Sequence, residues 1–93
     1  MVIQHKQGQH GMFYMENDGE MQAEMTYFMK GSDTMIIEHT EVSVELRGQN
    51  VGFKLVHAAV DFARHHQIKI IPACPFARSV FDKKPDWKDV LLS

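Results

Sequence analysis

The stretch Glu45-Leu46-Arg47-Gly48-Gln49-Asn50-Val51-Gly52 is the part of the chain from which the fold is best worked out. It lies between a β-like run, Met35 to Val42, and an amphipathic run from Val51 to about His66. A turn that leads from a strand into a helix gathers the unpaired backbone N–H groups of the helix's first turn around one point. Those donors and the positive end of the helix dipole favour an anion, above all a phosphate. The stretch therefore predicts a cradle for a pyrophosphate group.

The side chains of this cradle favour the same ligand. Gly48, Asn50 and Gly52 are small, tolerate positive φ angles and let a ligand approach the backbone closely. Arg47 adds a guanidinium that can fork onto phosphate oxygens. The residues expected to hold the pyrophosphate are Arg47, Gly48, Gln49, Asn50, Val51 and Gly52.

Composition narrows the classes of function. The 93 residues predict one domain spanning 1–93, and the formal net charge of −2 leaves no basic excess for binding nucleic acid. No apolar run approaches the roughly 20 residues needed to span a bilayer, and the N-terminal residues do not resemble a signal peptide, so no membrane association is expected. The single cysteine excludes an internal disulfide and fits a reducing cytoplasm.

Three β-like runs precede the cradle. They cover Met12 to Glu16, Met21 to Met29 and Thr34 to Val42, and Gly-containing turns separate them. Their alternating apolar residues predict an antiparallel meander, while residues 1–10 fit either a short edge strand or a loose terminus. In the third strand, regular alternation places Met35, Ile37 and His39 on one face and Ile36, Glu38, Thr40 and Val42 on the other.

A helix and a short strand follow the cradle. Val51, Leu55, Val56, Ala59, Phe62 and Ala63 recur at helical spacing, and 68–71 is short, β-branched and apolar. A strand, a crossover helix and a second strand form a βαβ unit, so the last strand should run parallel to the third. Pro75 suits the first position of a second helix that ends near Lys83. The predicted fold is α/β (α+β): a mixed sheet made of an antiparallel meander, then a βαβ unit and a short C-terminal helix.

With these elements in place, the chain resembles the GNAT superfamily of acyl-CoA N-acyltransferases. Arg47 to Gly52 is similar to that superfamily's Q/R-x-x-G-x-G/A pyrophosphate signature, with Asn50 in place of its first glycine. Three further motifs resemble a minimal bacterial subfamily of acetyltransferases: Ile37-x-His39-Thr40-x-Val42, Cys74-Pro75-Phe76-Ala77 and Lys84-Pro85-Asp86-Trp87.

The resemblance implies a sheet that splays open between the third and last strands, a bound acetyl-CoA, and transfer of its acetyl group to an amine. The pantetheine would lie in the splay and the pyrophosphate on the cradle. By the same resemblance, the cofactor contacts outside the cradle would be Ile37, His39, Thr40, Glu41, Val42, Cys74, Phe76, Ala77 and Phe81. The short form lacks the helix pair that helps wall the acceptor site in larger members, which suggests an open site or a protein acceptor. A monomer or weak dimer is expected.

Two side chains are candidates for catalysis. Cys74 falls where the last strand meets a helix N-terminus, a place that lowers the pKa of a thiol, so it could accept the acetyl group or position the thioester. It could equally be a small buried hydrophobe. His39 could take the proton from the attacking ammonium, with Glu41 as the alternative base, or it could be a structural histidine.

Other functions remain open from sequence alone. Larger GNAT members often carry a tyrosine, which protonates the departing thiolate, near the position of Phe81. A CoA-binding or sensing module with little turnover is therefore the alternative to an enzyme. A protein-interaction domain whose turn binds no anion is a third. No metal site is expected, because His57, His65 and His66 are not spaced to share a ligand set.

Overall fold

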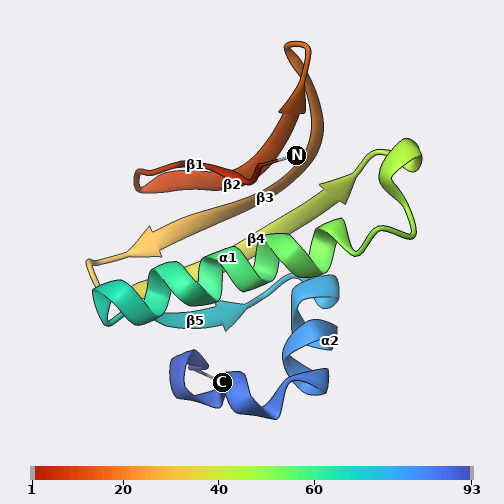
Figure 1. Cartoon of the computed structure of the whole chain (residues 1–93). Coiled ribbons are helices and arrows are strands. Elements are labelled where there is room, and N and C mark those ends of the chain that lie inside the picture. Colours follow the sequence, from red (N-terminus) through yellow and green to blue (C-terminus); the bar gives the residue numbers. More distant parts are fainter. Residues whose placement is uncertain (1, 93) are drawn as a thin grey trace.

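The computed structural model describes residues 2–92 and contains a five-stranded mixed sheet in the order β1-β2-β3-β4-β5 (Figure 1). The strands are β1 (Gln4–Lys6), β2 (His10–Asn17), β3 (Glu20–Lys30), β4 (Thr34–Val42) and β5 (Lys69–Pro72). Neighbours from β1 to β4 pair antiparallel, whereas β5 runs parallel to β4. The predicted fold class is confirmed, and residues 4–6 form a short edge strand, one of the two alternatives left open for residues 1–10.

The helix α1 (Val51–His66) makes the crossover from β4 to β5 and lies across one face of the sheet (Figure 1). Its buried stripe packs onto the inner face of the strands and consists of Val51, Gly52, Leu55, Val56, Ala59, Val60 and Ala63. The helix ends where predicted, at a C-cap Gln67 in the left-handed region (φ 53°), with basic residues in its last turn that complement the helix dipole.

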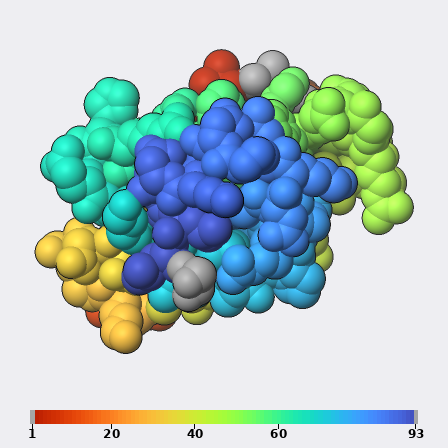
Figure 2. All heavy atoms as spheres, turned by 90° about the horizontal axis from the view of Figure 1, so that it is seen from below, coloured from red at the N-terminus to blue at the C-terminus, as the bar shows by residue number. Residues whose placement is uncertain are grey.

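Shorter helices close the β5 end of the molecule. They are α2 (Pro75–Lys83) and the 3-10 helix η2 (Pro85–Val90), whereas the 3-10 helix η1 (Val44–Leu46) lies beyond the end of β4 (Figure 1). Figure 2 shows that α2 and the C-terminal residues form one continuous surface when the molecule is seen from below. Trp87 of η2 is buried between Phe53 and His57 of α1 and Phe81 of α2, with ring centroids 5.4, 5.3 and 6.0 Å away.

A β-bulge changes the direction of the side chains in β4. Thr26 pairs with His39 and Tyr27 pairs with Ile37, so Glu38 has no partner on β3. Beyond this extra residue the alternation shifts by one position. Thr40 and Val42 therefore share the inner face with Ile37, and His39 and Glu41 lie on the outer face. The expectation that His39 shares a face with Met35 and Ile37, opposite Thr40 and Val42, is wrong because it assumed unbroken alternation.

The strands β4 and β5 separate after four paired positions, the last of which joins Ile37 and Pro72. The N–H groups of Ala73 and Cys74 then both donate to the Ile37 carbonyl, at 3.0 and 3.1 Å. The strand β4 continues to Val42, and within residues 2–92 this part of it pairs with β3 alone. Its edge from Glu38 to Val42 is therefore open to an incoming hydrogen-bonding group, as the expected splay requires.

Candidate functional site

The turn before α1 has the backbone conformation that its small residues predict. Gly48 has a φ of 84° and Asn50, the N-cap, has a φ of 59°. Asn is among the few residues other than glycine that adopt this region readily. The Asn50 side chain makes no capping hydrogen bond, and the first helical bond runs from the Lys54 N–H to the Asn50 carbonyl at 3.0 Å. The N–H groups of residues 51–53 are left without helical partners and face outward at the positive end of α1.

A cleft of about 390 Å³ opens between this turn, the free edge of β4 and the start of α2. Its lining combines Thr40, Val42, Leu46, Arg47, Gly48, Asn50, Val51, Gly52, Phe53 and Phe76. Eight of these ten were predicted from sequence to contact a cofactor, and the structure brings them together in one cleft. Leu46 and Phe53 were missed. Phe53 carried a usable signal, because it is an apolar residue outside the helical stripe that the core requires.

Gly52 has a role in the cleft that differs from the one expected. It is helical rather than positive in φ, and a Cβ at this position would lie 2.6 Å from Cζ of Phe76. The ring of Phe76 therefore rests directly on the α1 backbone and forms one wall of the cleft. Phe76 as a whole is 41% exposed. The glycine is needed for this contact between α2 and α1.

Cys74 lies at the inner end of the splay, as the N-cap of α2. Cys74 is only 6% exposed. Its thiol donates a hydrogen bond of 3.6 Å to Oγ1 of Thr40, which lies across from it on β4. Burial raises the pKa of Cys74, but hydrogen bonds from the backbone N–H of Ala77, from Thr40 and from the N–H of Phe76 outweigh burial, so the net pKa lies below that of an ordinary thiol. The thiol and the cleft wall are thus connected through Thr40.

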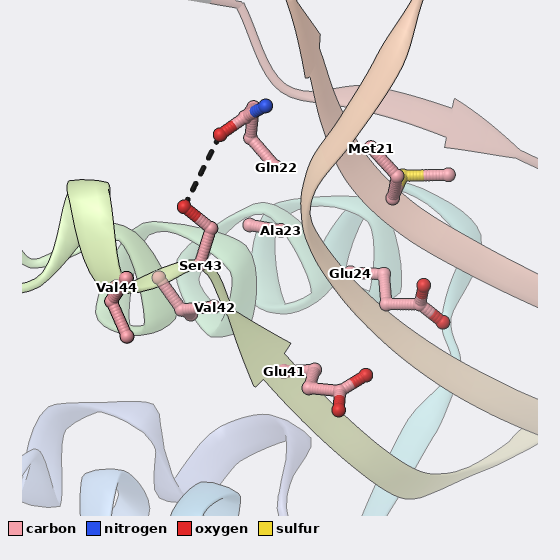
Figure 3. A pocket seen from close by; sticks show the side chains of 8 residues that line it. All are labelled: Met21, Gln22, Ala23, Glu24, Glu41, Val42, Ser43 and Val44. Atoms are coloured by element: carbon pink, nitrogen blue, oxygen red, sulfur yellow. Dashed lines mark hydrogen bonds between the residues drawn. The ribbon is translucent and has the colours of Figure 1, made fainter.

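His39 and Glu41 lie on the opposite face of β4 from the cleft. Both are exposed, and His39 Nε2 is 3.8 Å from Glu41 Oε1. Glu41 also lines a second hollow of about 310 Å³, shown in Figure 3, where Glu24 of β3 stands directly across from it. Ser43 donates a hydrogen bond of 3.2 Å to Gln22 on the other side of this hollow (Figure 3). Val42 lines both the hollow and the cleft.

The remaining predicted residues do not line the cleft. Ile37, Ala77 and Phe81 are buried in the core, while Gln49 is exposed in the turn and donates from its side chain to the Glu45 carbonyl at 3.4 Å. Among residues 2–92 no three His, Cys, Asp or Glu side chains are grouped as metal ligands would be. Across the same range, no helix has the length and hydropathy to cross a membrane.

A family model of GCN5-related N-acetyltransferases matches residues 12–90, a range that includes β4, the cradle and both main helices. The chain belongs to the family of GCN5-related N-acetyltransferases. The resemblance noted in the sequence is therefore confirmed. A GCN5-like candidate N-acetyltransferase from Staphylococcus aureus, solved by NMR, is similar over 97% of this chain and 88% of its own, with 40% identity and a TM-score of 0.76.

Other solved acetyltransferases share the fold at low identity. The ribosomal-protein-S18-alanine N-acetyltransferase of Escherichia coli has 14% identity and a TM-score of 0.64 over 83% of this chain. The chain spans 53% of that enzyme's length. An aminoglycoside N-acetyltransferase solved with CoA has 13% identity and a TM-score of 0.57, and the match covers 83% of this chain and 67% of that enzyme. No match was found among curated proteins.

Proposed function

We propose that this protein binds acetyl-CoA in the cleft between β4, α1 and α2 and transfers the acetyl group to an amine. The observation that carries the proposal is the convergence of an uncapped helix N-terminus, the Arg47 guanidinium and an unpaired strand edge on one cleft. The helix N-terminus and Arg47 can bind an anion, and the strand edge can hydrogen-bond a flexible polar chain that carries a thioester. Membership of an acetyl-transferring family supports the same assignment.

Each part of acetyl-CoA is assigned to a different part of the cleft. The pyrophosphate accepts hydrogen bonds from the free N–H groups of residues 51–53 and forms an ion pair with Arg47. The pantetheine amides pair with the open edge of β4 between Glu38 and Val42, as an added strand would. Leu46, Phe53 and Phe76 supply the apolar walls. The thioester then lies at the inner end of the splay, beside Cys74.

The reaction needs no co-reactant other than acetyl-CoA and the amine. The amine nitrogen attacks the thioester carbon, a C–N bond forms, the C–S bond breaks, and CoA leaves as a thiolate that takes up a proton. The ammonium proton passes to His39, which Glu41 contacts on the outer face of β4, or to water. Most of the rate enhancement comes from holding the amine and the thioester together.

Cys74 positions the thioester in this scheme. Its thiol is buried and engaged with Thr40, which suits packing beside the acetyl group better than attack on it. Covalent transfer through Cys74 is the competing mechanism. It predicts an acetylated protein after acetyl-CoA is mixed with the chain without an amine, detectable as an added acetyl mass that Cys74→Ala abolishes. The positioning role predicts no such adduct.

A CoA-binding or sensing module is the second candidate function. It is favoured by the burial of Phe81, at 4% exposure, in the region where a tyrosine acid would be expected. The two tyrosines of the chain, Tyr14 and Tyr27, lie on β2 and β3 instead. A thiolate would have to leave without a tyrosine proton, so slow turnover with tight CoA binding would support the sensing role.

Thermal stability with acetyl-CoA separates these functions from a simple interaction domain. Ligand at about 100 times its Kd adds about 2.7 kcal/mol to the free energy of unfolding, and raises the Tm of a chain this size by roughly 10 °C or more. Arg47→Glu should reduce the shift strongly, whereas Lys30→Glu, the same charge change at the last residue of β3, should not. Release of CoA thiol on adding amines then identifies an enzyme. No shift at millimolar acetyl-CoA would refute both CoA-dependent functions.

A further inference from the structure

The outer face of the sheet, on the side away from α1, carries a continuous row of side chains across four strands. In register, Lys6 of β1 pairs with Met12, Met12 with Thr26, and Thr26 with His39 of β4. Side chains of paired residues lie on the same face of a sheet. The row therefore ends at the β-bulge, next to Glu38, and no helix of the described chain covers it (Figure 1).

A cavity of about 370 Å³ lies along this row, and its two ends carry opposite charges. Lys6 and His10 line it at the β1–β2 end, and Glu38 lines it at the β4 end, with Thr26 between them. Three strand spacings, about 14 Å at the backbone, separate β1 from β4. Within residues 2–92, neither Lys6 nor Glu38 forms an ion pair. Each charge is therefore free to bind an oppositely charged group of one ligand.

The position of Glu38 sets the direction of such a ligand. Glu38 follows Ile37, whose carbonyl accepts from Ala73 and Cys74 at the point where β4 and β5 part. The acidic end of the cavity is therefore adjacent to the inner end of the splay, and the basic end points away from it along the sheet. A cationic group of a ligand would lie beside the splay, and an anionic group would lie over β1 and β2.

We propose that this cavity binds the acceptor, and that the acceptor is an amine that also carries an anionic group, a carboxylate or a phosphate. The inference depends on the acetyltransferase function proposed above. Glu38 draws the ammonium to the edge of β4 opposite the CoA cleft, and His39, the next residue and the register partner of Thr26, takes the proton that the nitrogen must lose. Lys6 and His10 bind the anionic group and select such amines over neutral or dicationic ones.

Matched pairs of amines test the proposal with the full chain and acetyl-CoA. L-Lysine is compared with cadaverine, which lacks the carboxylate, and phosphoethanolamine with ethanolamine, which lacks the phosphate. The anion-bearing member of at least one pair should have a kcat/KM higher by about tenfold or more, because a charge-assisted hydrogen bond is lost with the other. The pair that shows the preference distinguishes a carboxylate from a phosphate.

Two variants locate the preference. Lys6→Met should reduce it to about twofold or less, whereas Lys30→Met, which removes a charge from the same sheet outside the cavity, should leave it unchanged. Binding is followed separately by NMR titration of the CoA-loaded protein, so that slow turnover does not hide the result. The anion-bearing amines should shift the backbone amide signals of Thr26 and Glu38, and their matched partners should not.

Three results would overturn the proposal. Equal rates and equal amide shifts within both pairs would show that no anionic group is recognised. A preference for cadaverine that falls in Glu24→Gln or Glu41→Gln would place a dicationic acceptor in the other hollow. Preference unchanged in Lys6→Met would mean that the cavity is not the site. Failure of acetyl-CoA to stabilise the protein would remove the acetyltransferase function itself, which the matched pairs do not test.

Discussion

Gly11 and Gly48 are glycines for different physical reasons. A Cβ on Gly11 would lie 2.3 Å from Cζ of Tyr27 and 2.8 Å from the Lys6 carbonyl oxygen. The Tyr27 ring is fully buried across the Gly11 backbone, an arrangement that fills the space left by a glycine in a sheet. Gly48 has open space around it, but its φ of 84° costs free energy in any residue that has a side chain. One glycine is required by packing and the other by backbone conformation.

Alanine substitutions should therefore rank in a defined order. Gly11→Ala should lower the free energy of unfolding by about 3 kcal/mol or more, because neither a buried ring nor a paired backbone can move aside. Gly48→Ala should lower it by about 1–2 kcal/mol through backbone strain. Gly8→Ala, with its nearest neighbour at an ordinary 3.7 Å, serves as the control. Urea unfolding measures all three, and a larger effect at Gly48 than at Gly11 would contradict this reading.

The Cys74 thiol offers a second test at a single residue. Its pKa is lowered because hydrogen bonds from Ala77, Thr40 and Phe76 together exceed the effect of burial. Thr40→Val keeps the shape of the side chain and removes one of these bonds, so the pKa of Cys74 should rise in the variant. The pH dependence of the reaction with a small methanethiosulfonate measures it. An unchanged profile in Thr40→Val would show that the Thr40 hydroxyl does not stabilise the thiolate.

At the scale of elements, the side chain of His5 packs β1 against the core, in addition to the backbone pairing of β1 with β2. His5 is the partly buried residue of this three-residue strand. Its ring stacks on Phe13 at 4.0 Å between centroids, meets Phe62 edge-on at 4.6 Å, and its Nε2 is 2.5 Å from the Tyr27 hydroxyl. Burial, and then the nearby His66, lower the pKa of His5. Protonation of His5 should therefore weaken the packing of β1 against the core.

Stability should fall on acidification because of this group. With a folded pKa below the ordinary 6.5, the unfolded state binds the proton more tightly, so the contribution of His5 is complete above pH 6.5 and is lost as pH falls through its folded pKa. His5→Gln keeps a hydrogen-bonding group and removes the titration. The loss of stability between pH 7.5 and pH 5, measured by urea unfolding, should be smaller in the variant. An equal pH dependence in both proteins would exclude the effect.

The sequence predicts β4 and α1 but not the bulge within β4. The bounds of β4 and α1 follow from alternation and helical spacing because each has one buried face. The bulge at Glu38 interrupts that alternation without a glycine or proline to mark it. The available signal was a change of phase, since apolar and β-branched residues occupy 35 and 37 but then 40 and 42. Thr40 and Val42 were predicted as cofactor contacts only through the family resemblance.

At the scale of the molecule, β4 separates two faces with different chemistry. The inner face, beneath α1, leads to the cleft with the cradle, Phe53 and Phe76. The outer face has no helix over it among the described residues and carries His39, Glu41 and the charged cavity. The two faces meet at the edge of β4 beyond Ile37, which has no partner strand in the described part of the chain. We infer that cofactor and acceptor approach this edge from opposite sides and meet at the splay.

Mapping where acetyl-CoA binds tests most directly whether the cofactor occupies the cleft on the inner face. Backbone amide signals should be followed by NMR during titration of the full chain with acetyl-CoA. We expect the largest shifts at 47–53, at Thr40 and Val42 and at Cys74, with little change in β1 and in the β2–β3 turn. Saturable binding with its largest shifts on the outer face, or no binding at millimolar acetyl-CoA, would contradict it.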